Sequence, residues 1–440
     1  MHRLIVCIDG SWDDSTSTPN HSNIVHLLRS IETIDKRTQP SVMQYAQYRT
    51  AHFSSSLLSQ LLGVAYQSFS NCLFELYAFL CMNYSEDGKD EIFLLGYSKG
   101  AYVARILAAV INEIGILPRD QLRRFFPILK AFFERKRGGK VASEAEEVLK
   151  PWLLSSPSNT RHLEQQFIIK CLALFDCTVK PSPSLPGITS KFNSIITRPE
   201  SYFGLPDALL GQRIQHCYHA MALNENRANQ RELRLELLRG SEDMGQKCKQ
   251  VWFTGSSGDI GGSYSMKELS DISRMWIASQ INPLISLNKE VLMEQLAMPV
   301  FRYAIQPPHN PYTSKLTTLM PVKRKPKLIE GGTERIHSSV LLGSPDLAEP
   351  VIAAIEKNSN LIEELSELED EFMREWTVTD SRDTDDLEIT YALDIKHYNE
   401  EENESWVRKV LYTLQLVVAY VIISLLRRAG MLFGVNIQRL

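Results

Sequence analysis

One pentapeptide, Gly-Tyr-Ser-Lys-Gly at residues 96–100, restricts the local fold more than any other part of the sequence. The preceding residues 92–95 (IFLL) predict a short buried strand, and residues 101–110 (AYVARILAAV) predict a helix. The pattern G-x-S-x-G between a strand and a helix is typical of a nucleophile elbow, which projects the serine hydroxyl above a sheet. Its glycines let neighbouring backbones pass closely. We therefore predict such an elbow at Ser98, with an ordinary strand-to-helix turn as the alternative.

Strand and helix patterns alternate along the chain. Strands are predicted at 4–8, 42–48, 92–95, 167–175 and 249–253, and helices at 24–34, 57–84, 101–110, about 205–245 and 269–281. A charged helical stretch at about 120–165 predicts a cap inserted into the domain, whereas residues 306–335, rich in Pro, Lys and Thr, predict an irregular excursion. Asn23 is the candidate N-cap of the first helix. This alternation is typical of an α/β fold with a mostly parallel sheet and helices on both faces.

The composition is that of a globular protein, because 44% of the 440 residues are hydrophobic and 23% are charged. The formal net charge of −4 argues against general nucleic-acid binding. Seven cysteines without C-x-x-C pairs indicate reduced, buried thiols in an intracellular protein, and neither a disulfide framework nor a zinc site. The first strand begins at Leu4 with no apolar leader before it, so we expect no signal peptide.

The carboxyl-terminal part of the sequence has a different character. Residues 346–405 predict an acidic helix at 363–375 followed by a polar linker, and residues 406–440 predict an apolar helix. Residues 410–426 (VLYTLQLVVAYVIISLL) are almost wholly apolar and lie between two basic pairs, and this length is at the lower limit for a helix that spans a bilayer. A membrane-inserted or interfacial helix is one interpretation. A helix docked on the main domain and a self-association helix are the alternatives.

A serine nucleophile needs an acid, a base and donors for the oxyanion. Asp176 directly follows the predicted strand 167–175, where a carboxylate can orient an imidazole; an aspartate that caps a turn is the alternative. The predicted oxyanion donors are the backbone N–H groups of Gly10 or Ser11, after the first strand, and of Lys99. Aspartates in the first loop could instead bind a cation, but no matched third ligand accompanies them. We therefore expect no metal and no cofactor.

Four blocks, in order along the chain, resemble motifs of the type VI lipase effector family, a group of α/β-hydrolases. Residues 87–105 (DGKDEIFLLGYSKGAYVAR) are similar to the family's GDxIFLFGFSRGAYTAR. Residues 8–13 (IDGSWD), 173–179 (ALFDCTV) and 251–264 (VWFTGSSGDIGGSY) are similar to its FDGTWN, GVWDTVG and VWFPGVHSDVGGGY. A shorter match, IHSSV at 336–340, is similar to its IHPSV. The resemblance covers about 1–345 and implies an α/β-hydrolase domain with esterase or phospholipase activity on lipid-like esters.

The resemblance also assigns roles to single residues. The family's nucleophile corresponds to Ser98 and its triad acid to Asp176. Its base, the histidine of GVHSDVGGGY, corresponds to Ser257, and a serine hydroxyl cannot act as a general base near pH 7. His337 is the candidate replacement base, although the family carries a histidine in that block beside its triad base. Asp259 is expected to anchor the glycine-rich turn that follows it.

Two functions are left open by the sequence. The first is an active serine hydrolase of lipid-like esters, which retention of Ser98 and Asp176 favours. The second is a catalytically silent hydrolase-fold protein that binds a lipid, a small ligand or a protein, which the serine at position 257 favours. The expected partner of an active hydrolase is a lipid or a small ester. We expect no nucleic-acid partner for either function. Membrane association through residues 410–426 is compatible with both.

Overall fold

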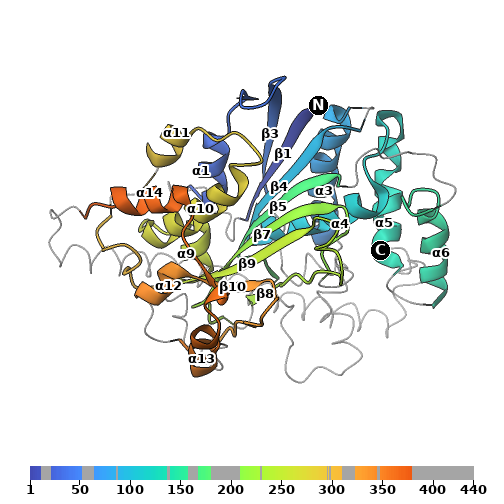
Figure 1. Cartoon of the computed structure of the whole chain (residues 1–440). Coiled ribbons are helices and arrows are strands. Elements are labelled where there is room, and N and C mark those ends of the chain that lie inside the picture. Colours follow the sequence, from blue (N-terminus) through green and yellow to red (C-terminus); the bar gives the residue numbers. More distant parts are fainter. Residues whose placement is uncertain are drawn as a thin grey trace, which may run out of the picture.

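The structure is a computed structural model in which a nine-stranded sheet forms the centre (Figure 1). It describes residues 1–10, 21–51, 64–85, 88–135, 139–156, 167–179, 209–227, 230–294, 296, 299–309, 323–343 and 347–378. The strand order is β11-β10-β9-β7-β5-β4-β1-β3-β2, and every neighbouring pair is parallel except β2 and β3. A sheet of this kind places the carboxyl ends of its parallel strands along one edge, where loops converge.

The elements follow in chain order. The strands of the sheet are β1 (His2–Asp9), β2 (Ile34–Asp35), β3 (Val42–Thr50), β4 (Glu91–Tyr97), β5 (Ile169–Phe175), β7 (Ile214–Ala222), β9 (Lys247–Phe253), β10 (Glu334–His337) and β11 (Ile362–Glu363), and a separate antiparallel pair is β6 (Thr178–Val179) and β8 (Arg231–Glu232). The helices are α1 (Asn23–Ser30), α3 (Val64–Asn83), α4 (Lys99–Ile114), η1 (Arg119–Arg124), α5 (Phe125–Glu134), α6 (Gly139–Leu149), α9 (Ser257–Gly261), α10 (Glu268–Ile281), α11 (Lys289–Glu294), α12 (Ser338–Gly343), α13 (Glu349–Lys357), η2 (Ser359–Leu361) and α14 (Glu367–Glu375).

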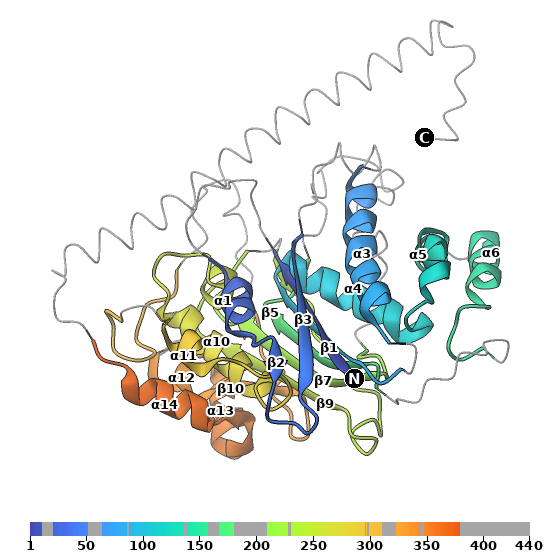
Figure 2. The same ribbon diagram turned by 90° about the horizontal axis from the view of Figure 1, so that it is seen from above.

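Helices cover both faces of the sheet (Figure 2). Successive side chains of β1 point to opposite faces, so Leu4, Val6 and Ile8 join one core and Ile5 and Cys7 the other. The first core packs against α3, α4, α5 and α6, and the second against α1 and α10. Both cores are fully apolar at the central strands, which is why these strands have almost no alternation of polar residues. The protein is therefore of the α/β class.

Most elements predicted from the sequence are confirmed. The five predicted strands correspond to β1, β3, β4, β5 and β9, and the helices predicted at 24–34, 101–110, 269–281 and 363–375 correspond to α1, α4, α10 and α14. The helix predicted at 57–84 corresponds to α3 in its described part, because residues 52–63 lie outside the described residues. The helical stretch at 120–165 contains α5 and α6.

Two predictions of local structure were wrong. Residues 205–245 contain β7, an interior strand of the sheet, and no helix is found in the described part of this stretch. Burial between β5 and β9 outweighs the polar composition that suggested a helix. The N-cap of α1 is Ser22, whose hydroxyl accepts from Val25 N. Asn23 lies one residue inside the helix, and its amide donates to the carbonyl oxygens of Ile260 (2.9 Å) and Ser270 (2.8 Å), which fixes α1 against the segment from α9 to α10.

Membrane-spanning character was assessed only for the described residues. Among them no single helix is both long and apolar enough to cross a bilayer, and one pair, Lys99–Ile114 with Arg119–Glu134, reaches that length only across a bend of 114°. The apolar segment 410–426 lies outside the described residues, as do residues 379–440 as a whole.

Candidate active site

Ser98 lies between the end of β4 and the start of α4, in a backbone conformation that few residues other than glycine adopt. Its φ is 52° and its ψ is −114°. Two glycines allow the chain to close around it: a Cβ atom on Gly100 would lie 2.2 Å from the carbonyl oxygen of Ile8, and one on Gly10 would lie 2.3 Å from that of Tyr97. The end of β1 therefore crosses directly over the turn at Ser98.

Asp176 occupies the equivalent place on the neighbouring strand. Tyr97 of β4 pairs with Phe175 of β5, so the two residues that follow, Ser98 and Asp176, lie next to each other at the carboxyl edge of the sheet. Asp176 also has a positive φ of 39°, and within the described residues only Ala304 besides these two is a non-glycine with this property. A positive φ at such residues costs about 1–3 kcal/mol and is concentrated at functional sites. The two strained residues thus mark one site.

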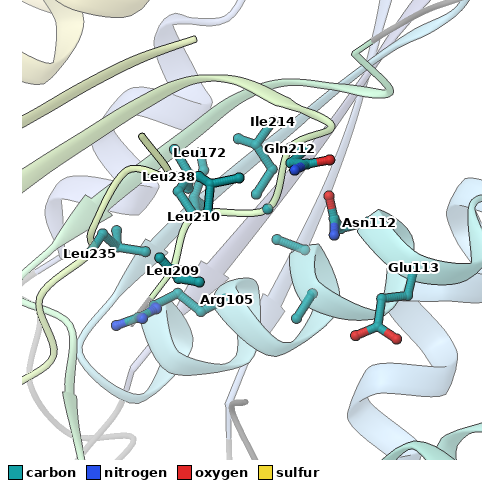
Figure 3. A pocket seen from close by; sticks show the side chains of 13 residues that line it. Arg105, Asn112, Glu113, Leu172, Leu209, Leu210, Gln212, Ile214, Leu235 and Leu238 are labelled. Atoms are coloured by element: carbon teal, nitrogen blue, oxygen red, sulfur yellow. The ribbon is translucent and has the colours of Figure 1, made fainter. Parts of the chain in front are cut away.

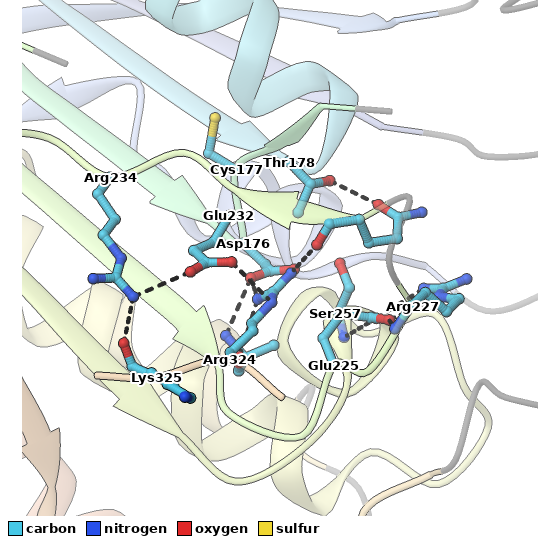
Figure 4. A network of polar contacts seen from close by, with 12 residues as sticks. Asp176, Cys177, Thr178, Glu225, Arg227, Glu232, Arg234, Ser257, Arg324 and Lys325 are labelled. Atoms are coloured by element: carbon cyan, nitrogen blue, oxygen red, sulfur yellow. Dashed lines mark hydrogen bonds and ion pairs between the residues drawn. The ribbon is translucent and has the colours of Figure 1, made fainter. Parts of the chain in front are cut away.

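The carboxylate of Asp176 is held by an arginine from a distant part of the chain (Figure 4). Arg324 donates from Nη1 to Oδ1 at 2.5 Å and from Nη2 to Oδ2 at 3.2 Å. The same guanidinium donates to the carbonyl oxygens of Ala222 (3.0 Å) and Gln230 (2.8 Å). Both side chains are buried, so this is a desolvated bidentate ion pair. Both carboxylate oxygens contact the guanidinium, and Oδ1 also accepts from the N–H of Ala222 at 3.1 Å.

The pKa of Asp176 records this pairing. Burial by itself raises the pKa of this carboxyl, but the charge and hydrogen bonds of Arg324 outweigh burial. The hydroxyl of Ser257 and the N–H of Ala222 act in the same direction, and the resulting pKa is below the ordinary value. Asp176 is therefore an ionised carboxylate whose charge is neutralised inside the protein.

The hydroxyl of Ser98 is fully buried, and its hydrogen-bond contact within the described residues is long. Its Oγ lies 3.5 Å from Thr178 Oγ1, which donates in turn to Gln230 Oε1 at 3.0 Å. No imidazole is found beside Ser98 among the hydrogen bonds of the described residues. A serine without a base within hydrogen-bonding distance is a poor nucleophile.

The predicted oxyanion donors are only partly available. The N–H of Gly10 donates to the carboxylate of Asp9 at 2.9 Å, so this donor is engaged within its own loop. Gly10 still lies close to the backbone nitrogen of Lys99, the first residue of α4, as the crossing of β1 over the turn requires. Ser11 lies outside the described residues. The same Asp9 accepts from Ser22 Oγ and Tyr48 Oη.

Ser257, at the position of the family's base, begins the short helix α9 and is buried. Its backbone N–H donates to Glu225 Oε2 at 3.2 Å, and Glu225 forms a second bidentate pair with Arg227. Asp259 caps the start of this helix, because its Oδ2 accepts from the backbone N–H of Ser256 at 2.7 Å in a capping box, whereas its predicted role was in the glycine-rich turn that follows it. The start of α9 is thus held by hydrogen bonds at Ser256 and Ser257, and Ser257 lies close to Asp176.

The histidines that follow Asp176 in the sequence have other partners. His337 ends β10, and four strand spacings of about 4.8 Å, or about 19 Å, separate β10 from β4. Its Nε2 is 3.0 Å from Glu369 and its Nδ1 accepts from the N–H of Ser339, so the structure does not bring His337 and Ser98 together. The Nδ1 of His309 lies 2.6 Å from Asp259 Oδ1.

His219 lies in β7 and takes part in the site through the backbone. Its Nε2 accepts from the N–H of Cys177 at 3.0 Å, so the proton of the neutral ring is on Nδ1. Burial lowers its pKa to about 3, which keeps the ring neutral at physiological pH. His219 therefore fixes the loop after Asp176.

Arg324, Gln230 and Thr178 were not predicted from the sequence. Arg324 lies in the stretch 306–335, which has no helix or strand periodicity, and its contact with Asp176 spans 148 residues. A local pattern gives no signal for such a contact. Among the described residues, no group of three or more His, Cys, Asp or Glu side chains is arranged to hold a metal ion.

A cavity of about 240 Å³ lies between α4 and the loops at the ends of β7 (Figure 3). Its large aliphatic side chains are Leu172, Leu209, Leu210, Ile214, Leu235 and Leu238. Two of its polar side chains are bound to backbone, since Arg105 donates to the carbonyl oxygen of Leu233 and Asn112 accepts from the N–H of Arg213. Neither Ser98 nor Asp176 lines it, so the cavity is separate from the candidate site.

Comparison with known proteins agrees with the geometry. The family model "T6SS, Phospholipase effector Tle1-like, catalytic domain" matches residues 2–280. An uncharacterised protein of Saccharomyces cerevisiae, YEL023C, is 22% identical over 243 residues, which are 52% of this chain and 32% of that protein. A solved structure of the Tle1 effector bound to the VgrG spike from the type VI secretion system covers 59% of this chain and 50% of the solved chain, at 15% identity and a TM-score of 0.27. The chain thus spans about a third of its curated relative and half of the solved chain.

Because the family match includes both Ser98 and Asp176 and more than half of the chain, the protein belongs to the family of Tle1-like phospholipase effector catalytic domains.

Proposed function

We propose that this protein is a member of the lipase-like family whose serine site does not turn over esters. The ion pair between Arg324 and Asp176 carries the proposal, because the buried guanidinium already neutralises the carboxylate charge with which a triad acid orients and stabilises an imidazolium. Ser257 supports it from the other side, since a hydroxyl cannot take the proton of Ser98 near pH 7. The carboxylate at the acid position is already neutralised by a buried cation, and the base is absent at the position that the resemblance gives it.

The role that we propose instead is binding of lipid-like molecules by an α/β-hydrolase fold, with residues 120–165 as its helical cap. Membership of a phospholipase family supports lipid as the ligand class. The apolar residues 410–426 support association with a membrane, as an anchor or as an interfacial helix.

An active esterase is the second candidate, and one observation favours it. Ser98 keeps the strained φ of 52° that a nucleophile elbow requires, at a cost of about 1–3 kcal/mol. Strain of this kind persists where the surrounding structure enforces it, and here the glycines at 10 and 100 do so. The strained backbone at Ser98 is therefore evidence for an active enzyme. It is weaker than the evidence for an inactive one that the Arg324–Asp176 ion pair gives.

A fluorophosphonate probe, which labels activated serines, separates the two candidates. We expect the parent protein to be labelled no more than Ser98→Ala. We also expect Ser257→His to remain unlabelled, because Arg324 still holds Asp176. Labelling should appear in Ser257→His/Arg324→Met and not in the matched Ser257→His/Arg335→Met, whose arginine pairs with Glu363 elsewhere. Urea unfolding verifies that each variant is folded. Stoichiometric labelling of the parent, lost in Ser98→Ala, would show that the enzyme is active.

The proposed anchor is tested by alkaline carbonate extraction of membranes from cells that express the full chain. An inserted helix of residues 410–426 should keep the protein in the membrane fraction, and truncation after Glu404 should release it. Release of the full chain by carbonate would exclude a spanning helix and leave an interfacial one.

A further inference from the structure

Residues 323–329, which form neither helix nor strand, are here called the lysine strap, and exposed residues alternate in them with less exposed ones. Lys323, Lys325 and Lys327 are exposed, whereas Arg324 between the first two is buried against Asp176. The three lysine side chains are therefore on the exposed side of the strap, while Arg324 ties the strap to Asp176 at the carboxyl end of β5.

The strap is fixed from below at several points. Arg324 is bound to Asp176 and to two backbone carbonyls, the carbonyl oxygen of Lys325 accepts from Arg234, and the N–H of Lys327 donates to Glu334 at 2.8 Å. The backbone on which the lysines stand is thus ordered before any partner binds. Preorganisation of this kind reduces the entropy cost of association.

The outer side of the strap combines free positive charge with an exposed apolar side chain. Within the described part of the chain, none of the three lysine ammonium groups forms an ion pair. Ile329, at the end of the strap, is 64% exposed, the largest exposed fraction among the large hydrophobic side chains described. Basic residues beside an exposed aliphatic side chain are typical of surfaces that bind the interface of an anionic bilayer.

We propose that the lysine strap binds the surface of an anionic bilayer. This inference rests on the proposed association with lipid, and it adds the charge of the lipid and the face of the protein that meets it. The three lysines complement anionic headgroups, while Ile329 distinguishes a bilayer from a soluble polyanion, which offers no apolar phase. The chain as a whole has a net charge of −4, which an anionic bilayer repels. The attraction must therefore come from the local cluster of lysines.

The test is sedimentation of the full chain with vesicles of phosphatidylcholine, with and without 30% phosphatidylserine. Replacing the strap lysines (Lys323→Gln, Lys325→Gln, Lys327→Gln) should weaken binding to the anionic vesicles by at least about tenfold, since each lysine contributes separately. Binding to neutral vesicles, which reports residues 410–426, should not change. The difference between parent and variant should shrink in 0.5 M salt.

A control removes three exposed lysines outside both the strap and the proposed cap: Lys36→Gln, Lys89→Gln and Lys247→Gln. This control should bind anionic vesicles as the parent does. The proposal is overturned if the strap variant binds like the parent, if the control weakens equally, or if heparin binds the parent as tightly as anionic vesicles do. Because serine labelling is measured separately, failure here leaves the proposal of a silent serine site standing.

Discussion

Arg324 and Asp176 decide, at the scale of single residues, what the candidate site can do. Each has its charge buried, and each is tolerated because the other is present. Three backbone groups complete the pair, since Arg324 also binds the carbonyl oxygens of Ala222 and Gln230, and Asp176 accepts from the N–H of Ala222. The pair is therefore part of the stability of the domain as well as of its chemistry.

A double-mutant cycle measures this dependence. Arg324→Met should lower the free energy of unfolding by about 3–5 kcal/mol, because it leaves the buried carboxylate of Asp176 without a counter-charge. Asp176→Asn, in which asparagine tolerates the positive φ, should lower the free energy of unfolding by a similar amount, because it leaves the buried guanidinium of Arg324 without a counter-charge. The double variant should lose at least about 2 kcal/mol less than the sum, since no unpaired charge remains. Urea unfolding measures all three.

The control for this cycle is the exposed pair Lys140 and Glu144 on α6. Its coupling should stay below about 0.5 kcal/mol, as for other surface pairs four residues apart on a helix. Additive single effects at Arg324 and Asp176 would mean that the two side chains are not paired in solution.

Elements with a strong local pattern could be predicted from the sequence. The runs that became β1, β4 and β9 are apolar and bounded by polar residues, and the pentapeptide at 96–100 located the turn between β4 and α4. The apolar run 167–175 likewise placed Asp176 at the end of a strand, and the structure shows that this strand, β5, pairs with β4. These features depend on a few consecutive residues, which is why a single sequence contains them.

Elements that depend on distant neighbours could not be predicted. In β7, polar and small residues such as His216, His219 and Ala220 are acceptable because strands lie on both sides. Strands β10 and β11 have four and two residues, too few for a pattern. Arg324 reaches the site across 148 residues of chain, so its role appears only when the chain is folded.

At the scale of the whole molecule, the buried His219 in the sheet makes the free energy of unfolding depend on pH. Its ordinary pKa of 6.5 falls to about 3 in the folded protein, because burial disfavours the imidazolium. Below pH 6.5 the unfolded chain binds a proton that the folded protein does not, so folding weakens as the pH falls toward 3. The loss is about 1.4 kcal/mol per pH unit for one such group.

His219→Gln, whose carbonyl can still accept from Cys177, removes this group. We expect the free energy of unfolding of the variant to fall less steeply between pH 6 and pH 4, with the two curves converging by about 1.4 kcal/mol per pH unit. Urea titrations across this range measure it. His216→Gln should act in the same direction down to about pH 4 and less below it, because burial lowers the pKa of His216 only to about 4. Parallel curves for His219→Gln and the parent would refute the assignment.

The strands β10 and β11 have a consequence for where the folding unit ends. The family match stops at residue 280, yet Glu334–Ile336 of β10 pairs with Gln250–Trp252 of β9. A fragment cut at the homology boundary would contain Ser98, Asp176 and Ser257 but would leave one edge of β9 without its partner. Unsatisfied backbone groups beside the buried ring of Trp252 are a template for intermolecular strand addition. Such a fragment should aggregate: the unit recognised by homology is smaller than the unit that stays soluble.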